Sequence, residues 1–179
     1  MEHQVKEFTT KETAAELRKA LRAAYPGVRF SVRMARGSAH GWFDVNYVDG
    51  PPTEVVDQIC HRFQSLDFDG RDDGYHPVEP TLYATEDGGL FEPRYSCCGV
   101  ATRREYTPEV QEWAETIAVE GTRWWNDTEY PQKAEPVYYA TRALLGGLDL
   151  TNGLPDHPER VWRSRWEWTK RGPVDRPAT

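Results

Sequence analysis

Two short segments that alternate between apolar and polar side chains set the strongest limit on how this chain of 179 residues folds. The segments are residues 28–34, VRFSVRM, and residues 42–48, WFDVNYV. Successive side chains of a strand point to opposite faces, so we expect two strands that each bury one face. The connection, ARGSAHG, is typical of a turn, and the pair predicts a β-hairpin. The expected core positions are Val28, Phe30, Val32, Met34, Phe43, Val45 and Tyr47.

Three helices are predicted around this hairpin. Thr9 and Glu12 have the spacing of a capping box, and the helix that they begin is expected to end at Pro26. A second helix is expected from Thr53, because the apolar residues that follow it recur at helical spacing. Thr107, followed by a proline, predicts the start of the third helix.

The remaining segments complete an α+β fold. Residues 81–106 predict two short strands around a turn at residues 86–89, which gives the order helix-strand-strand-helix-strand-strand-helix. We therefore expect a small antiparallel sheet with helices packed on one face. A further helix is expected from Pro136, so residues 1–121 form the predicted α+β module and residues 122–179 a helical, aromatic-rich C-terminal extension packed on it.

Composition narrows the classes of function. A net charge of -7 and a pI near 5.3 argue against wrapping a long nucleic-acid backbone, which needs a strongly positive surface. The sequence has three cysteines, no signal-peptide pattern and no apolar segment near 18 residues long. We therefore expect a cytoplasmic protein with reduced thiols that does not associate with a membrane.

Residues 66–76, LDFDGRDDGYH, have the composition of a metal site. An EF-hand loop needs oxygen ligands at positions one, three and five and a glutamate at position twelve, and these are missing whether the loop begins at Asp67 or at Asp69. The expected structure is a turn in which aspartates bond nearby backbone N–H groups and Gly70 and Gly74 adopt positive φ. The predicted turn residues are Asp69, Gly70, Asp73 and Gly74, and we expect neither a metal nor a cofactor.

Four segments together resemble a known family. They are ETAAELRKAL at residues 12–21, YPGVRFSVR at 25–33, VDGPPTEVVDQICHRF at 48–63 and FDGRDDGY at 68–75. This ordered set, and less clearly the chain to Arg104, resembles the large polyvalent-protein-associated domain family, type 29, a module of phages and conjugative elements. The resemblance implies an accessory module without an assigned reaction, which accompanies anti-restriction and DNA-processing domains.

Two groups of residues are predicted as binding surfaces. The first is the polar side of the first strand, with Arg29 and Arg33, together with Arg36 in the following turn. This surface would suit phosphates or an acidic partner. The alternative is a solvated strand face that is paired with Asp44 across the hairpin. The second is a last helix, expected from Asp156, which carries aromatic and basic side chains side by side. Such mixtures are enriched in binding hot spots, or else the tryptophans dock on the rest of the protein. The residues of this second group are Trp162, Arg163, Arg165 and Trp166.

Catalysis has weaker support. A nucleophile at Cys97 or Cys98 would need a histidine base and a third orienting group, and no spacing in the sequence proposes them. Cys60 falls on the apolar side of the second helix and is expected in the core. Zinc-ligand pairs and glycine-rich nucleotide loops are absent from the sequence.

The function predicted from the sequence is therefore that of a non-enzymatic accessory protein of a phage or mobile element. It would bind a macromolecule, expected to be a host or phage protein such as a host defence or DNA-processing protein. The alternatives are a nucleic-acid-binding module that uses Arg29, Arg33 and Arg36, and an enzyme that uses Cys97 or Cys98.

Overall fold

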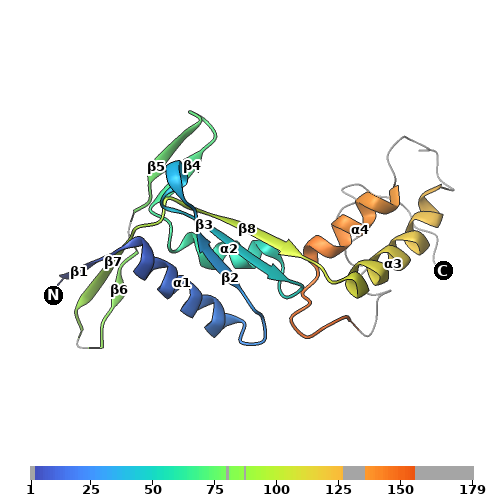
Figure 1. Ribbon diagram of the computed structural model, residues 1–179, viewed down its shortest axis with the longest axis horizontal. Coiled ribbons are helices and arrows are strands. Elements are labelled where there is room, and N and C mark those ends of the chain that lie inside the picture. The colour runs from blue at the N-terminus through green and yellow to red at the C-terminus, as the bar shows by residue number, and fades with distance from the viewer. Residues whose placement is uncertain (1–2, 80, 87, 127–135, 156–179) are drawn as a thin grey trace. The chain divides into compact units, whose positions relative to one another are not determined.

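The computed structural model describes residues 3–79, 81–86, 88–126 and 136–155, and these form two compact units (Figure 1). One unit, here called the α+β unit, comprises residues 1–48 and 53–105, and the other comprises residues 49–52 and 106–179. The elements of the α+β unit are β1 (His3–Phe8), α1 (Thr10–Ala24), β2 (Ser31–Met34), the 3₁₀ helix η1 (Gly37–Ala39), β3 (Trp42–Val48), α2 (Thr53–His61), β4 (Leu66–Asp69), β5 (Gly74–Pro77), β6 (Tyr83–Ala84), β7 (Leu90–Tyr95) and β8 (Gly99–Glu105).

The main sheet of the α+β unit has the strand order β2-β3-β8. Strand β3 lies in the centre, antiparallel to β2 and parallel to β8. Phe43, Val45 and Tyr47 alternate along β3 and are almost completely buried, while the residues between them face the other side. The alternation in the sequence therefore correctly predicts which face of this strand is covered.

Helices α1 and α2 cover that face. Helix α1 begins with the predicted capping box: the Thr9 side chain accepts from the Glu12 backbone N–H at 3.3 Å, and the Glu12 carboxylate accepts from the Thr9 N–H at 2.9 Å. Both helices then direct apolar side chains at the sheet, in agreement with their helical spacing. The buried core comprises Ala14, Leu17, Leu21, Val32, Phe43, Val45, Tyr47, Val56, Cys60, Phe63 and Cys97.

Two smaller sheets complete the α+β unit. Strand β7 pairs with β1 in parallel and with β6 in antiparallel orientation, around the turn predicted at residues 86–89. Strands β4 and β5 form a separate two-stranded hairpin, which Figure 1 shows projecting from the rest of this unit.

The second unit contains α3 (Pro108–Asn126) and α4 (Pro136–Gly147), which lie side by side (Figure 1). Their shared core comprises Val110, Ala114, Leu144, Leu145, Leu148 and Leu150. Two hydrogen bonds tie residues 49–52 to this unit: the Asp49 carboxylate accepts from the Thr107 N–H at 3.0 Å, and the Gly50 carbonyl accepts from the Leu150 N–H at 2.7 Å. The segment that joins β3 to α2 is thereby part of the helical unit.

The α+β class and the starts of α1, α2, α3 and α4 agree with the sequence prediction. Strand β1 was not predicted, and residues 81–106 contain three strands where two were expected. Strand β8 does not pair with the β6–β7 hairpin that precedes it. It pairs in parallel with β3 of the main sheet, and local sequence patterns do not reveal this long-range pairing. Met34 was predicted in the core, but it lies at the end of β2 and is 42% exposed, so that prediction is wrong. The domain boundary predicted after residue 121 stays a prediction.

Gly99 gives a test of how tightly β8 packs on β3. The two strands place Gly99 opposite Trp42, and a Cβ added to Gly99 would overlap the Trp42 ring. We expect Gly99→Ala to destabilise the protein by about 1–3 kcal/mol, the usual cost of overpacking. Chemical denaturation measures the loss, and Gly27→Ala is the control because a Cβ there meets open space. A Gly99→Ala variant as stable as the Gly27→Ala variant would contradict this packing.

Candidate binding surfaces of the α+β unit

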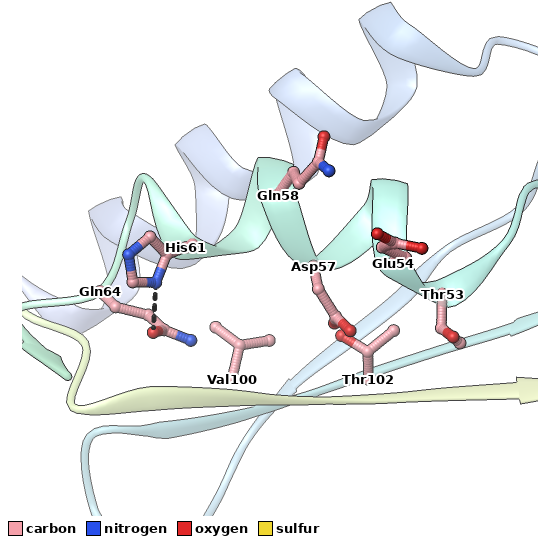
Figure 2. Close-up of a pocket in the computed structure, with 8 residues that line it drawn as sticks. All are labelled: Thr53, Glu54, Asp57, Gln58, His61, Gln64, Val100 and Thr102. Carbon is pink, nitrogen blue, oxygen red and sulfur yellow. Dashed lines mark hydrogen bonds between the residues drawn. The ribbon is translucent and has the colours of Figure 1, made fainter. Parts of the chain in front are cut away.

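A groove lies between helix α2 and strand β8 (Figure 2). It is open to solvent, and its volume is about 670 Å³. Val100 and Thr102 form its floor, because alternate residues of β8 point to the side on which α2 lies. Helix α2 forms the wall of the groove. Gln64, in the connection that follows α2, lies at the end of the groove. The lining residues are Thr53, Glu54, Asp57, Gln58, His61, Gln64, Val100 and Thr102.

The side chains along the groove include two carboxylates, Glu54 and Asp57, and one histidine, His61. Thr53, Asp57 and His61 follow one another at four-residue spacing and so form one stripe along α2. Figure 2 shows Asp57 directed toward β8 beside Thr102, whereas the Gln58 side chain points away from the strand. At the end of the groove, His61 Nδ1 and Gln64 Oε1 share a hydrogen bond of 3.2 Å. Lys and Arg are absent from the lining residues, so the groove suits a cationic ligand.

A second surface is a cluster of three aromatic rings, Phe68, Tyr75 and Trp42, here called the aromatic cluster. Phe68 and Tyr75 are register partners in the β4–β5 hairpin, with ring centroids 5.2 Å apart. Tyr75 also contacts Trp42, a residue of the main sheet. Their rings pack in an edge-to-face arrangement with centroids 5.5 Å apart. Phe68 is 49% exposed and Tyr75 is 52% exposed. The cluster thus joins the hairpin to the open face of the sheet and leaves two rings half in water.

Of the predicted arginines, only Arg33 lies within a strand. Its register partner on β3 is Asp44, as the solvated-face interpretation expects, but the two side chains form no ion pair within the described residues. Arg29 precedes β2 and Arg36 lies between β2 and η1. Sequence reasoning missed Arg103, which the β3–β8 pairing places on the same open face as Arg33. No local signal predicts this, because the pairing joins segments far apart in the sequence.

The aspartate-rich segment is the β4–β5 hairpin with its turn. The Asp69 carboxylate accepts from the Arg71 N–H at 2.9 Å, and the Asp72 carboxylate accepts from the Gly74 N–H at 3.1 Å. Such turn-forming bonds were predicted, but positive φ occurs at Asp73, with φ 55°, and not at Gly70 or Gly74. Aspartate tolerates this left-handed conformation because its short side chain bonds locally, so the glycines were the wrong choice.

The same turn brings together three side chains with metal-ligand chemistry. The ligand atoms of Asp69, Asp72 and His76 lie within 4.8 Å of one another. His76 Nε2 and the Asp72 carboxylate already share a hydrogen bond of 2.7 Å, and Arg71 lies 3.4 Å from the Asp69 carboxylate. These contacts give the carboxylates partners within the hairpin and account for their positions without an ion.

We predict that this hairpin binds no divalent metal specifically. Thermal melts with calcium, magnesium, zinc or EDTA should coincide, because a ligand at 100 times its dissociation constant would stabilise the fold by about 2.7 kcal/mol. Asp72→Asn is the control for any residual effect, since it removes one carboxylate and keeps the shape of the turn. A rise in melting temperature with one metal that disappears in Asp72→Asn would contradict the prediction.

The cysteines differ in their access to solvent. Cys60 and Cys97 are each 1% exposed, whereas Cys98 is half-buried. Burial raises the pKa of Cys60 and of Cys97 to about 12, because the thiolate is poorly solvated in the core. At neutral pH only about one such thiol in 10⁵ is ionised, so neither is a ready nucleophile.

We therefore expect one fast-reacting thiol in the native protein. Ellman's reagent should modify Cys98 within minutes and should modify Cys60 and Cys97 only after unfolding in guanidinium. Cys98→Ser should remove the fast phase and leave the other two thiols unchanged. A fast phase that persists in Cys98→Ser would show that a buried thiol is reactive and would reopen the enzymatic interpretation.

The predicted residues Trp162, Arg163, Arg165 and Trp166 lie outside the described residues. Within the described residues, no helix has both the length and the apolar character needed to cross a membrane. The family described as large polyvalent protein associated domain 29 matches residues 8–107. Neither the curated proteins nor the solved structures contain a match to the chain.

Proposed function

Because the chain belongs to the large polyvalent protein associated domain 29 family, we propose that it is a non-enzymatic accessory protein of a phage or mobile element. In this proposal it acts by binding another protein in the cytoplasm of the host cell. The partner is a host or phage protein, such as one that takes part in defence or in DNA processing.

The observation that carries the proposal is the exposure of Phe68 and Tyr75 in the aromatic cluster. A large aromatic side chain buries about 150–250 Å² when it is fully covered, so each half-exposed ring leaves roughly 100 Å² in water. At about 25 cal/mol per Å², covering each ring would contribute some 2–3 kcal/mol to an interface. Aromatic side chains are the anchors that binding hot spots use most.

The position of the rings also suits an anchor. Phe68 and Tyr75 are register partners across a short hairpin and their rings are tilted at 55° to each other. Trp42 of the main sheet contacts the Tyr75 ring. Rigid aromatic groups lose little conformational entropy on binding, so most of the energy of covering them contributes to affinity.

The charge of the chain favours a protein over a nucleic acid. A net charge of -7 repels a polyanion over most of the surface. On the open face of the main sheet, Arg33 lies opposite Asp44, so the positive charge there is partly offset.

Nucleic-acid binding is the second candidate, and one observation favours it. Arg33, Arg103 and Trp42 share the open face of the β2-β3-β8 sheet. Single-stranded nucleic acid binds to sheets that combine aromatic stacking with basic side chains. Arg29 and Arg36 are exposed nearby in the sequence and would add charge.

A capture experiment tests the proposal. The tagged protein is incubated with lysate of the host, with and without nuclease, and bound proteins are identified by mass spectrometry. We expect a partner that resists nuclease and is lost in Phe68→Ser/Tyr75→Ser. The matched control is Val5→Ser/Leu82→Ser, which removes two side chains that are 47% and 50% exposed and lie outside the aromatic cluster.

The nucleic-acid candidate predicts a different pattern. Capture would then be lost on nuclease treatment and in Arg33→Glu/Arg103→Glu, with affinity that falls steeply as salt rises. Equal capture by the Phe68→Ser/Tyr75→Ser variant and the Val5→Ser/Leu82→Ser control would exclude the aromatic cluster as the anchor.

A further inference from the structure

We propose that the groove between α2 and β8 binds an extended, basic peptide segment, which adds as a strand to the edge of β8 that faces away from β3. The inference deepens the proposed function, because it names the chemistry of a segment within a protein partner. It concerns a surface other than the aromatic cluster, so the two can be tested separately.

The first argument is the position of β8 at the edge of the sheet. In the order β2-β3-β8, strand β8 pairs with β3 and with no other strand among the described residues. Alternate residues of a strand direct their N–H and C=O groups to opposite edges, so half of these groups in Gly99–Glu105 face away from β3. An edge of this kind is a template for a further strand.

The second argument is the helix that runs beside this edge. Figure 2 shows α2 passing along β8, with Val100 and Thr102 directed into the space between them. A peptide that pairs with β8 would place alternate side chains into this groove, under the stripe of Thr53, Asp57 and His61. The backbone hydrogen bonds would supply affinity and the groove would supply specificity, as in known cases of strand addition to a sheet edge.

The third argument is charge, which selects the occupant. Glu54 and Asp57 are both exposed at the groove, and Lys and Arg are absent from its lining. Lysine or arginine at alternate positions of the bound strand would lie near these two carboxylates. Gln58, Gln64 and Thr53 add neutral hydrogen-bonding groups and no competing cation. An acidic strand would be repelled, and an uncharged one would gain only the backbone bonds.

The length of β8 limits the size of the segment. The strand has seven residues, Gly99–Glu105, so a peptide of about that length would use the whole edge. A fluorescent seven-residue peptide that alternates lysine and threonine is therefore the probe. Its counterpart alternates glutamate and threonine. Two further probes carry the lysine sequence with N-methyl groups on the backbone nitrogens of alternate residues. One is methylated at the odd-numbered residues and the other at the even-numbered residues.

Fluorescence polarisation of the full chain with these probes tests the proposal. We expect the lysine peptide to bind and the glutamate peptide not to bind. Only the N-methyl register that blocks the bonds to β8 should abolish binding, because the other register directs its methyl groups away from the strand. Glu54→Lys/Asp57→Lys should weaken the lysine peptide at least tenfold.

The control variant is Glu109→Lys/Glu112→Lys on α3. It makes the same change in net charge, at the same three-residue spacing, and also begins in the first turn of a helix. It should bind the lysine peptide as the unchanged protein does, and thermal melts of both variants verify that they fold.

Three results would overturn the inference: no binding of the lysine peptide at millimolar concentration, equal binding of both N-methyl registers, or equal binding by the groove variant and its α3 control. If these occur while Phe68→Ser/Tyr75→Ser still abolishes protein capture, the groove proposal fails and the proposed function stands.

Discussion

The buried side of strand β3 is the constraint on which the α+β unit depends. Phe43, Val45 and Tyr47 are 1%, 0% and 3% exposed, and each such side chain stabilises the fold by about 1.5–3 kcal/mol when it is fully buried. Helices α1 and α2 must both pack on this one side to cover it, which leaves the opposite side of the sheet open. The location of α2 and of the open face therefore has a single cause. The groove beside α2 and the aromatic cluster at the open face therefore both depend on the packing of the helices on one side of β3.

The pairing of β3 with β8 positions residues of both candidate binding surfaces. It places Gly99 under the Trp42 ring, where a larger residue would not fit, and Trp42 in turn contacts Tyr75 of the hairpin. Among the described residues the same pairing leaves β8 at the edge of the sheet, with Val100 and Thr102 on the side covered by α2. The hairpin turn adds a further restraint, since the hydrogen bond between Asp72 and His76 links the turn to strand β5. The aspartates that resemble a metal site in the sequence thus form hydrogen bonds within the hairpin.

Local patterns predicted what depends on local physics. Alternation identified the buried face of β3, and the capping residues Thr9 and Glu12 marked the start of α1, because both signals act over a few residues. The parallel pairing of β8 was not predictable in this way, since its energy comes from contacts with a strand more than fifty residues earlier in the sequence. For the same reason Arg33 was recognised as a surface residue and Arg103, which lies on the same open face, was not. The groove was missed because it exists only once α2 and β8 lie side by side. The residues Trp162 and Trp166 remain predictions.

A module that acts by binding needs surfaces that are exposed and yet rigid. An exposed aromatic pair on a mobile loop would lose much of its binding energy in becoming ordered, whereas Phe68 and Tyr75 are already fixed as register partners in a hairpin that Trp42 supports. The groove has the same property, because its wall is a helix anchored by the buried Val56 and Cys60 and its floor is a strand of the main sheet. Burial raises the pKa of Cys60 to about 12, which keeps this anchor uncharged and apolar at neutral pH. The side of α2 that secures the fold and the side that lines the groove are thus separated on one helix, so substitutions at Glu54 and Asp57 change the charge of the groove while the core stays intact.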